Sequence, residues 1–257
     1  MPEGGKSKSA GGGQQINKDP MAERRRVATL QRAAEKADTE SGMTPAQRKG
    51  INDFEEKYKN ASIEHAAIIG TDGRVIAESG RGTANSTSVS YNPFHDYSND
   101  YLTHNHPLQY GRESVAGRIG QSFSGTDIKT AKEYGLKGIR AKTENYVYSI
   151  ERTGSSWPST SRVKSLYENA RKEYMLRTVL SKQGWKEIDG IKSKRARTSE
   201  INRTYKSIGD RLRFEYYRKY GREQYDERRA RLMTQADHQA MKVVAKELGL
   251  KYTRRRT

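Results

Sequence analysis

The sequence predicts an α+β fold, in which a β-sheet domain with flanking helices is followed by a basic all-α C-terminal region. Three observations carry this prediction. Short apolar runs separated by turn signals fill the middle of the chain, as expected for strands. Apolar residues at helical spacing fill the last third. Only 32% of the residues are hydrophobic and 31% are charged, which favours a modest core with long solvated segments.

The N-terminal part of the chain offers little material for a core. Residues 1–20 are rich in Gly, Ser and Lys, and we expect a disordered tail. Residues 21–60 are expected to be a helical segment, with one helix at 21–36 and a second beginning at Thr44, a good N-cap before a proline. The apolar stripe of that second helix consists of Ile51, Phe54 and Tyr58.

Residues 61–154 are predicted to form the β-sheet domain. An Asp72-Gly73 turn signal makes the first two strands a hairpin. A short helix is expected at residues 125–134, because Gly135 is a good terminator. The six expected strands are residues 63–70, 74–79, 87–91, 101–106, 137–141 and 146–152.

One expected strand carries two of the five histidines, His104 and His106. Alternate side chains of a strand share a face, so the two imidazoles point the same way. A carboxylate from the following helix would complete a three-ligand site, the arrangement of catalytic zinc. The chain has no cysteine, so any metal must be held by His, Asp or Glu. Glu64, at the start of an apolar run, can handle the proton of an attacking water.

These residues resemble the signature of the JAB/JAMM (MPN-type) zinc metallopeptidases. The resemblance covers about residues 60–152, and it implies a JAB/MPN-like sheet domain. It implies that His104, His106 and Asp127 are zinc ligands. It also implies that Glu64 is the general acid/base, and that Ser124 helps to stabilise the oxyanion. The sequence is similar, more narrowly, to domains of bacteriophage head-assembly and mobile-element proteins.

Each part of this signature has a simpler explanation as well. Ser124 and Asp127 have the spacing of a capping box at a helix N-terminus. Glu78, on the partner strand of the hairpin, is a rival to Glu64 for the acid/base role. Sixteen residues, 108–123, separate the His-Asn-His-Pro motif from Ser124, so we expect an extra loop over or beside the site.

Residues 155–257 are predicted to be a basic helical region. From residue 161 onward there are 27 Lys and Arg against 12 Asp and Glu, which accounts for most of the net charge of +18. Such a charge favours nucleic acid, or an acidic protein, as a partner. We expect helices at residues 163–183, 200–220 and 222–248, a basic connector at 185–199, an end to the first helix at Gly184, and a cationic tail at 253–257. Four tyrosines among these basic residues can stack on bases or pack between helices: Tyr216, Tyr217, Tyr220 and Tyr225.

Two functions remain open from the sequence. The first is a zinc-dependent peptidase or isopeptidase acting on a protein substrate or a co-assembled protein, in phage or mobile-element particle assembly. The second is a non-catalytic structural or nucleic-acid-binding assembly protein, such as a minor head or packaging component, with a vestigial JAB fold. The chain has no apolar run long enough for a membrane span and no apolar signal-peptide core, so we expect a cytoplasmic or virion-associated protein without a membrane partner.

Overall fold

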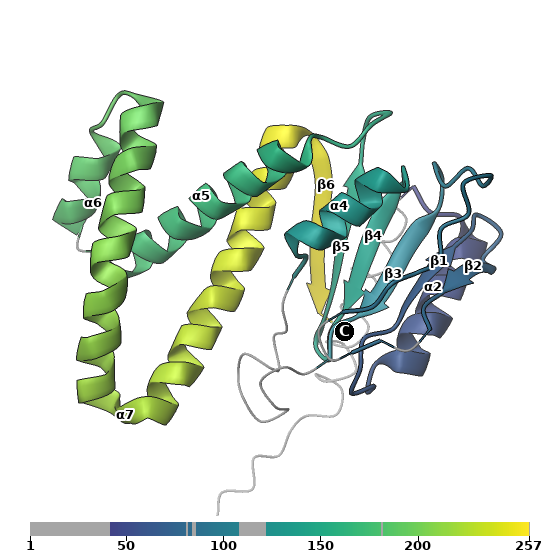
Figure 1. Ribbon diagram of the computed structural model, residues 1–257, viewed down its shortest axis with the longest axis horizontal. Coiled ribbons are helices and arrows are strands. Elements are labelled where there is room, and N and C mark those ends of the chain that lie inside the picture. Colours follow the sequence, from purple (N-terminus) through teal and green to yellow (C-terminus); the bar gives the residue numbers. More distant parts are fainter. Residues whose placement is uncertain (1–41, 81, 84–85, 108–121, 181, 257) are drawn as a thin grey trace, which may run out of the picture. The chain divides into compact units, whose positions relative to one another are not determined.

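The computed structural model describes residues 42–80, 82–83, 86–107, 122–180 and 182–256 (Figure 1). The tail expected at 1–20, the helix expected at 21–36 and most of the loop expected at 108–123 lie outside these residues. Of the side chains between residues 209 and 227, only that of Arg218 is described, so the four tyrosines of that stretch are outside the description too.

The centre of the fold is one mixed six-stranded sheet with the strand order β2-β1-β3-β4-β5-β6, which confirms the predicted α+β class. Strands β3 and β4 are parallel, and every other neighbouring pair is antiparallel. Strands β3, β4 and β6 therefore run in the same direction, and their C-terminal ends lie at the same end of the sheet (Figure 1). The strands are β1 Ala66–Ile69, β2 Val75–Glu78, β3 Tyr101–Asn105, β4 Gly138–Lys142, β5 Tyr146–Arg152 and β6 Leu250–Arg256.

Helices cover both faces of the sheet. Helix α2 (Pro45–Tyr58) begins at the predicted N-cap, where the Thr44 side chain accepts a hydrogen bond from the Gln47 amide. It packs Ile51 and Phe54 against one face, in a small cluster that includes Tyr101 of β3. The opposite face carries the larger core, shared with helices α4 (Gly125–Glu133), α5 (Thr160–Val179) and α7 (Lys194–Leu248). Successive residues of β3 therefore enter different layers.

The predicted hairpin is present between β1 and β2. Gly73 adopts φ +84°, the left-handed conformation that such a turn requires and that glycine adopts without strain. A strand expected at residues 87–91 does not form. Both edges of β1 are occupied, by β2 and by β3, so a further strand has no free edge there. The segment instead buries Val89 in the main core, and the Val89 carbonyl accepts a hydrogen bond from the Tyr134 hydroxyl.

The C-terminal region is helical, but its elements differ from those expected. The first helix, α5, ends at Val179, and Gly184 lies inside the next helix, α6 (Lys182–Asp189). Much of the expected connector at residues 185–199 is therefore helix. Its apolar residues explain why, since Trp185 and Ile188 are buried in a separate small core with Leu176 and Ile201.

Helix α7 is one helix of 55 residues rather than two, and Gly221 lies in its interior. An interior glycine costs a helix only about 1 kcal/mol, which a helix of this length tolerates. Figure 1 shows that α7 turns sharply part-way along its length, so that it has two arms. No helix of the described residues is long and apolar enough to cross a membrane.

Residues 253–256, which were expected to belong to a cationic tail, form part of a strand. Gly249, with φ +64°, terminates α7, and the next residues form strand β6 along the free edge of β5. The C-terminal region is therefore not all-α. Leu250 and Tyr252 pack against the main core, and this burial ties the basic strand to the sheet.

Candidate metal centre

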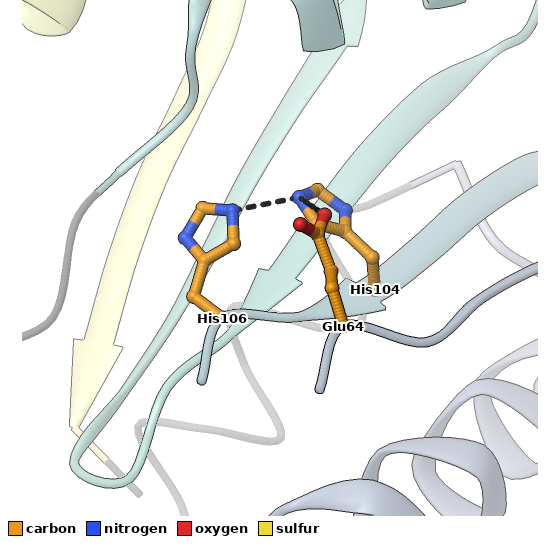
Figure 2. A group of neighbouring side chains, drawn as sticks. All are labelled: Glu64, His104 and His106. Carbon is orange, nitrogen blue, oxygen red and sulfur yellow. Dashed lines mark hydrogen bonds and ion pairs between the residues drawn. The ribbon is translucent and has the colours of Figure 1, made fainter. Parts of the chain in front are cut away.

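His104 and His106 lie together at the end of β3, on the face of the sheet that α4 covers. His104 is buried and His106 is half-buried, and their Nε2 atoms are 2.9 Å apart. Figure 2 shows the two rings pointing toward each other. The predicted shared face of the two histidines is confirmed. Strand β3 itself ends at Asn105, and the backbone N–H of His106, one residue later, donates to the Lys142 carbonyl of β4.

Asp127 reaches the histidines from the N-terminus of α4. The Ser124 backbone N–H and hydroxyl both donate to Asp127 Oδ2, at 2.5 and 2.8 Å, and the Asp127 N–H donates back to the Ser124 hydroxyl at 3.2 Å. The capping box is therefore real. The other carboxylate oxygen, Oδ1, lies 3.4 Å from His104 Nε2. One oxygen of the Asp127 carboxylate therefore caps the helix, and the other oxygen faces the His104 imidazole.

Glu64 approaches from a third segment. The first strand begins at Ala66 rather than at residue 63, so Glu64 lies in the chain that leads into β1. Its Oε1 is 4.0 Å from His104 Nε2. Ligand atoms of Glu64, His104 and His106 lie within 4.8 Å of one another, a spacing at which they can hold a metal ion (Figure 2).

The position of Glu64 is fixed by residues that sequence reasoning did not identify. Asn105, whose side chain points to the opposite face from the two histidines, accepts from the His65 N–H at 2.6 Å and donates to the Ile63 carbonyl at 3.1 Å. The Glu64 N–H donates to the Thr83 carbonyl at 2.7 Å. A Cβ on Gly82 would lie 2.0 Å from the Glu64 carbonyl oxygen, so only glycine permits this approach.

Burial sets the charge of the centre. Desolvation lowers the pKa of His104, so its imidazole is neutral near pH 7 and Nε2 can offer a lone pair. Desolvation, and secondarily the negative charge of Asp127, raises the pKa of Glu64 to about 7. A carboxyl group with such a pKa can both accept and return a proton near neutral pH.

The group whose ligand atoms all lie within 4.8 Å of one another contains the predicted ligands His104 and His106, but its third member is Glu64 rather than Asp127. At zinc–ligand distances of about 2.0–2.1 Å, two ligand atoms of a tetrahedral site lie about 3.3 Å apart. The His104–Asp127 separation of 3.4 Å matches this edge, and the His104–His106 separation of 2.9 Å needs a small opening. The Glu64 oxygen, at 4.0 Å from His104 Nε2, is farther than one such edge, yet it lies within the group of possible ligands.

Two other candidates are placed less favourably. The Ser124 hydroxyl donates to Asp127, so it would have to turn away to reach an oxyanion, and that role stays a prediction. Glu78 is directed to helix α2, where it accepts from the Tyr58 hydroxyl at 2.7 Å and lies 3.5 Å from Lys57 Nζ. The structure therefore brings Glu64, and not Glu78, to the histidines.

No family model, curated protein or solved structure matches this chain.

Proposed function

We propose that the protein is a zinc-dependent peptidase or isopeptidase of the JAB/JAMM type, with an MPN-like sheet domain. The observation that carries this proposal is the set of side chains that surrounds His104 Nε2. Three groups face this buried atom, and they come from three separate segments: His106 after β3, Asp127 from α4 and Glu64 from the chain before β1. A metal centre requires ligand atoms from separate segments around one point, and the ligand atoms of Glu64, His104 and His106 all lie within 4.8 Å of one another.

The exposure of the centre favours catalysis over a purely structural ion. His104 is 1% exposed and Glu64 is 9% exposed, whereas His106 and Asp127 are half-buried. A structural zinc site is closed by four protein ligands, whereas a catalytic site keeps one position open. Here a set of three ligands with one accessible side fits the catalytic kind.

The residues divide the chemistry of amide hydrolysis among them. Zinc bound here would supply Lewis acidity toward the scissile carbonyl and make an attacking water more acidic. Glu64 would accept the proton of that water and deliver it to the leaving amine. The neutral His104 would hold its side of the centre rigidly, because it is buried between the sheet and Phe123. Asp127 would contribute charge from a carboxylate already fixed by the helix cap.

The proposal is tested by metal content and hydrolysis together. Protein loaded with zinc and desalted should retain about one zinc per chain by elemental analysis, and His104→Ala should retain none. Loaded protein should cleave fluorescein-labelled casein or an ε-linked lysine isopeptide, with loss of activity after chelation. Wild-type protein that retains no zinc would refute the proposal, and protein that retains zinc without any turnover would reduce it to a binding site.

A second candidate function is a nucleic-acid-contacting assembly protein. The observation that favours it is the exposure of basic side chains along α7, among them Lys194, Arg195 and Lys206. Phosphate contacts from such residues are independent of sequence and weaken with salt. This function can coexist with hydrolysis, because α7 and the metal centre use different residues.

A further inference from the structure

One side of the C-terminal part of α7 carries a row of cationic and amide side chains. This part of the helix leads into β6 (Figure 1). Six such residues recur at intervals of three or four positions: Arg228, Arg231, Gln235, Gln239, Lys242 and Lys246. Residues at these intervals lie above one another on one side of an α-helix. We call this set the cationic stripe, and at a rise of 1.5 Å per residue it is about 27 Å long.

The opposite side of the same segment is packed against the protein. Met241 and Val244 belong to the main core. Asp237 accepts a hydrogen bond from the Tyr167 hydroxyl and pairs with Arg171, and both of these partners lie on α5. The four cationic members of the stripe are exposed, and its two glutamines are half-buried. Packing therefore fixes this part of the helix and turns the cationic stripe toward solvent.

Few negative charges offset the cationic stripe. Asp237 is the only acidic residue from position 228 to position 246, and it lies on the packed side. Among the described residues, Arg231, Lys242 and Lys246 take part in no ion pair. The helix macrodipole favours Lys246 in the last turn, but Arg231 and Lys242 lie more than one turn from the end of α7. Cations at this spacing repel one another, so a ligand with negative charge along its length would stabilise the stripe.

We infer that the cationic stripe binds the phosphate backbone of duplex DNA. This inference rests on the proposed nucleic-acid-contacting function, and it gives that function a site and a form of nucleic acid. Duplex DNA carries one negative charge per about 1.7 Å of its axis, so a stripe of about 27 Å lies along about eight base pairs. The amides of Gln235 and Gln239 lie between the cations, where they can donate hydrogen bonds to phosphate oxygens.

Stiffness and composition favour the duplex over other polyanions. Arg231 and Lys242 are separated by about 16 Å of helix, and the stripe has no charged member between them. A duplex is stiff over about 50 nm and bridges such a gap without bending. An acidic peptide would lose conformational entropy on following the same line. A single strand is usually held by aromatic side chains on which its bases stack, and the stripe contains no aromatic residue.

Duplex binding can be measured on the full chain by fluorescence anisotropy. The probe is a fluorescein-labelled duplex of about 20 base pairs, titrated at several salt concentrations. The stripe variant, Arg231→Gln/Lys242→Gln/Lys246→Gln, should bind this duplex about tenfold or more weakly at about 0.1 M salt. Its slope of log affinity against log salt should also be shallower, by about 0.9 for each phosphate contact that is lost.

Two comparisons separate the stripe from net charge. The control variant, Lys49→Gln/Lys59→Gln/Arg74→Gln, also removes one arginine and two lysines, all at exposed positions of the sheet domain, and should keep the wild-type slope. Gln239→Lys adds a cation within the stripe and should steepen the slope by about 0.9, because a lysine at this half-buried position can extend its ammonium group to solvent. Asn52→Lys, at an exposed position of α2, adds the same charge and should leave the slope unchanged.

Four contrary results can be told apart. Equal changes of slope in the stripe and control variants would overturn the inference, because net charge alone would then explain binding. A change of slope in Lys194→Gln/Arg195→Gln/Lys206→Gln but none in the stripe variant would also overturn it, and would leave the nucleic-acid function to the other end of α7. Tighter binding of a single strand of the same length would overturn it in favour of that ligand. Wild-type protein that binds no duplex at low salt would refute the nucleic-acid function itself, before any substitution is made.

Discussion

The side chain of Asn105 holds the backbone on both sides of Glu64, by accepting from the His65 N–H and donating to the Ile63 carbonyl. Asn105 is 3% exposed, so water does not compete for these bonds. The two histidines of the centre flank Asn105 in sequence. One short segment of β3 therefore places the candidate metal ligands on one face and fixes the candidate base from the other.

Replacing Asn105 should impair turnover more than metal binding. Asn105→Leu keeps the branched shape of the side chain but removes both hydrogen bonds and leaves two part-buried backbone groups unpaired, at a cost of up to about 1–3 kcal/mol for each group. We expect turnover to fall by at least about tenfold, since Glu64 is no longer held. Zinc content should stay near the wild-type value. Asn99→Leu, at an exposed asparagine, is the control. Loss of zinc from Asn105→Leu would show that Asn105 supports the ligands rather than Glu64.

Glu64→Gln should separate metal binding from catalysis. The amide keeps the size of the side chain but cannot accept a proton, so turnover should fall by at least about a hundredfold while zinc is retained. Glu78→Gln should leave both unchanged, because Glu78 faces Tyr58 and Lys57. If Glu64→Gln strips the metal, then Glu64 is a ligand and the set that holds zinc is Glu64, His104 and His106.

Gly82 should tolerate no side chain. A Cβ there would lie 2.0 Å from the Glu64 carbonyl oxygen, so Gly82→Ala must push the backbone of Glu64 away. We expect a loss of about 1–3 kcal/mol in the free energy of unfolding, as for other overpacked sites, together with lower turnover. Gly80→Ala is a close control, since nothing lies within 4 Å of its Cβ position. Urea denaturation of both variants measures the difference, and equal stability would contradict the clash.

Acid should destabilise the protein partly through Glu55. This buried carboxylate of α2 forms two bonds with the Arg140 guanidinium, Nε–Oε1 at 2.8 Å and Nη2–Oε2 at 3.0 Å. Burial by itself would raise the pKa of Glu55, but the charge and hydrogen bonds of Arg140 outweigh burial and lower it. The stabilisation is therefore complete above the unfolded pKa of about 4.3 and is lost as the pH falls through the lower folded value.

The Glu55 contribution can be isolated by mutation. Glu55→Gln should cost about 3–5 kcal/mol at pH 7, because it leaves Arg140 buried without a counter-charge. The double variant Glu55→Leu/Arg140→Met removes both charges and should be much closer to wild type in stability at pH 7. Urea titrations between neutral and acid pH should show a shallower loss of stability in the double variant. The same acid sensitivity in both proteins would assign the effect to other carboxyl groups.

DNA binding, if α7 carries it, should depend on surface charge rather than on the fold. A truncation near residue 155 is not a clean test, because it removes β6 from the sheet along with the helices. Substituting Lys194, Arg195 and Lys206 by glutamine keeps the sheet intact. The slope of log affinity against log salt should then become shallower by about 0.9 for each phosphate contact removed. An unchanged slope would show that these residues do not contact DNA.

The sequence predicted those parts of the site that depend on local chemistry. Strand alternation placed His104 and His106 on one face, and the Ser124–Asp127 spacing placed a carboxylate at a helix start. Both predictions are confirmed. Asn105 and Gly82 escaped prediction because their roles arise from contacts between segments distant in sequence, with residues 63–65 and with the Glu64 carbonyl. Neither the hydrophobic periodicity of a sequence nor the spacing of its motifs indicates such long-range contacts.

The main error of the sequence prediction concerned β6. Leu250 and Tyr252 alternate with polar residues directly after Gly249, which is a strand pattern following a helix terminator. The run of three arginines obscured that pattern, because cationic ends of chains are commonly solvated. Pairing with β5 and burial against the main core outweighed the charge of this strand. Burial also outweighed charge in the expected basic connector. Trp185 and Ile188 are buried together there, and the segment that contains them is helical.

The return of β6 to β5 has a consequence for the order of folding. The Thr153 hydroxyl, at the end of β5, donates to the Gly249 carbonyl before β6, and these residues are 96 positions apart in sequence. Closing a flexible loop of that length reduces the chain entropy. The part of the free-energy cost that grows with loop length is about 4 kcal/mol. Helices α5, α6 and α7 have a small core of their own around Trp185, and forming it first would shorten the loop to be closed. Refolding should therefore slow markedly when that core is weakened, although its residues lie outside the sheet.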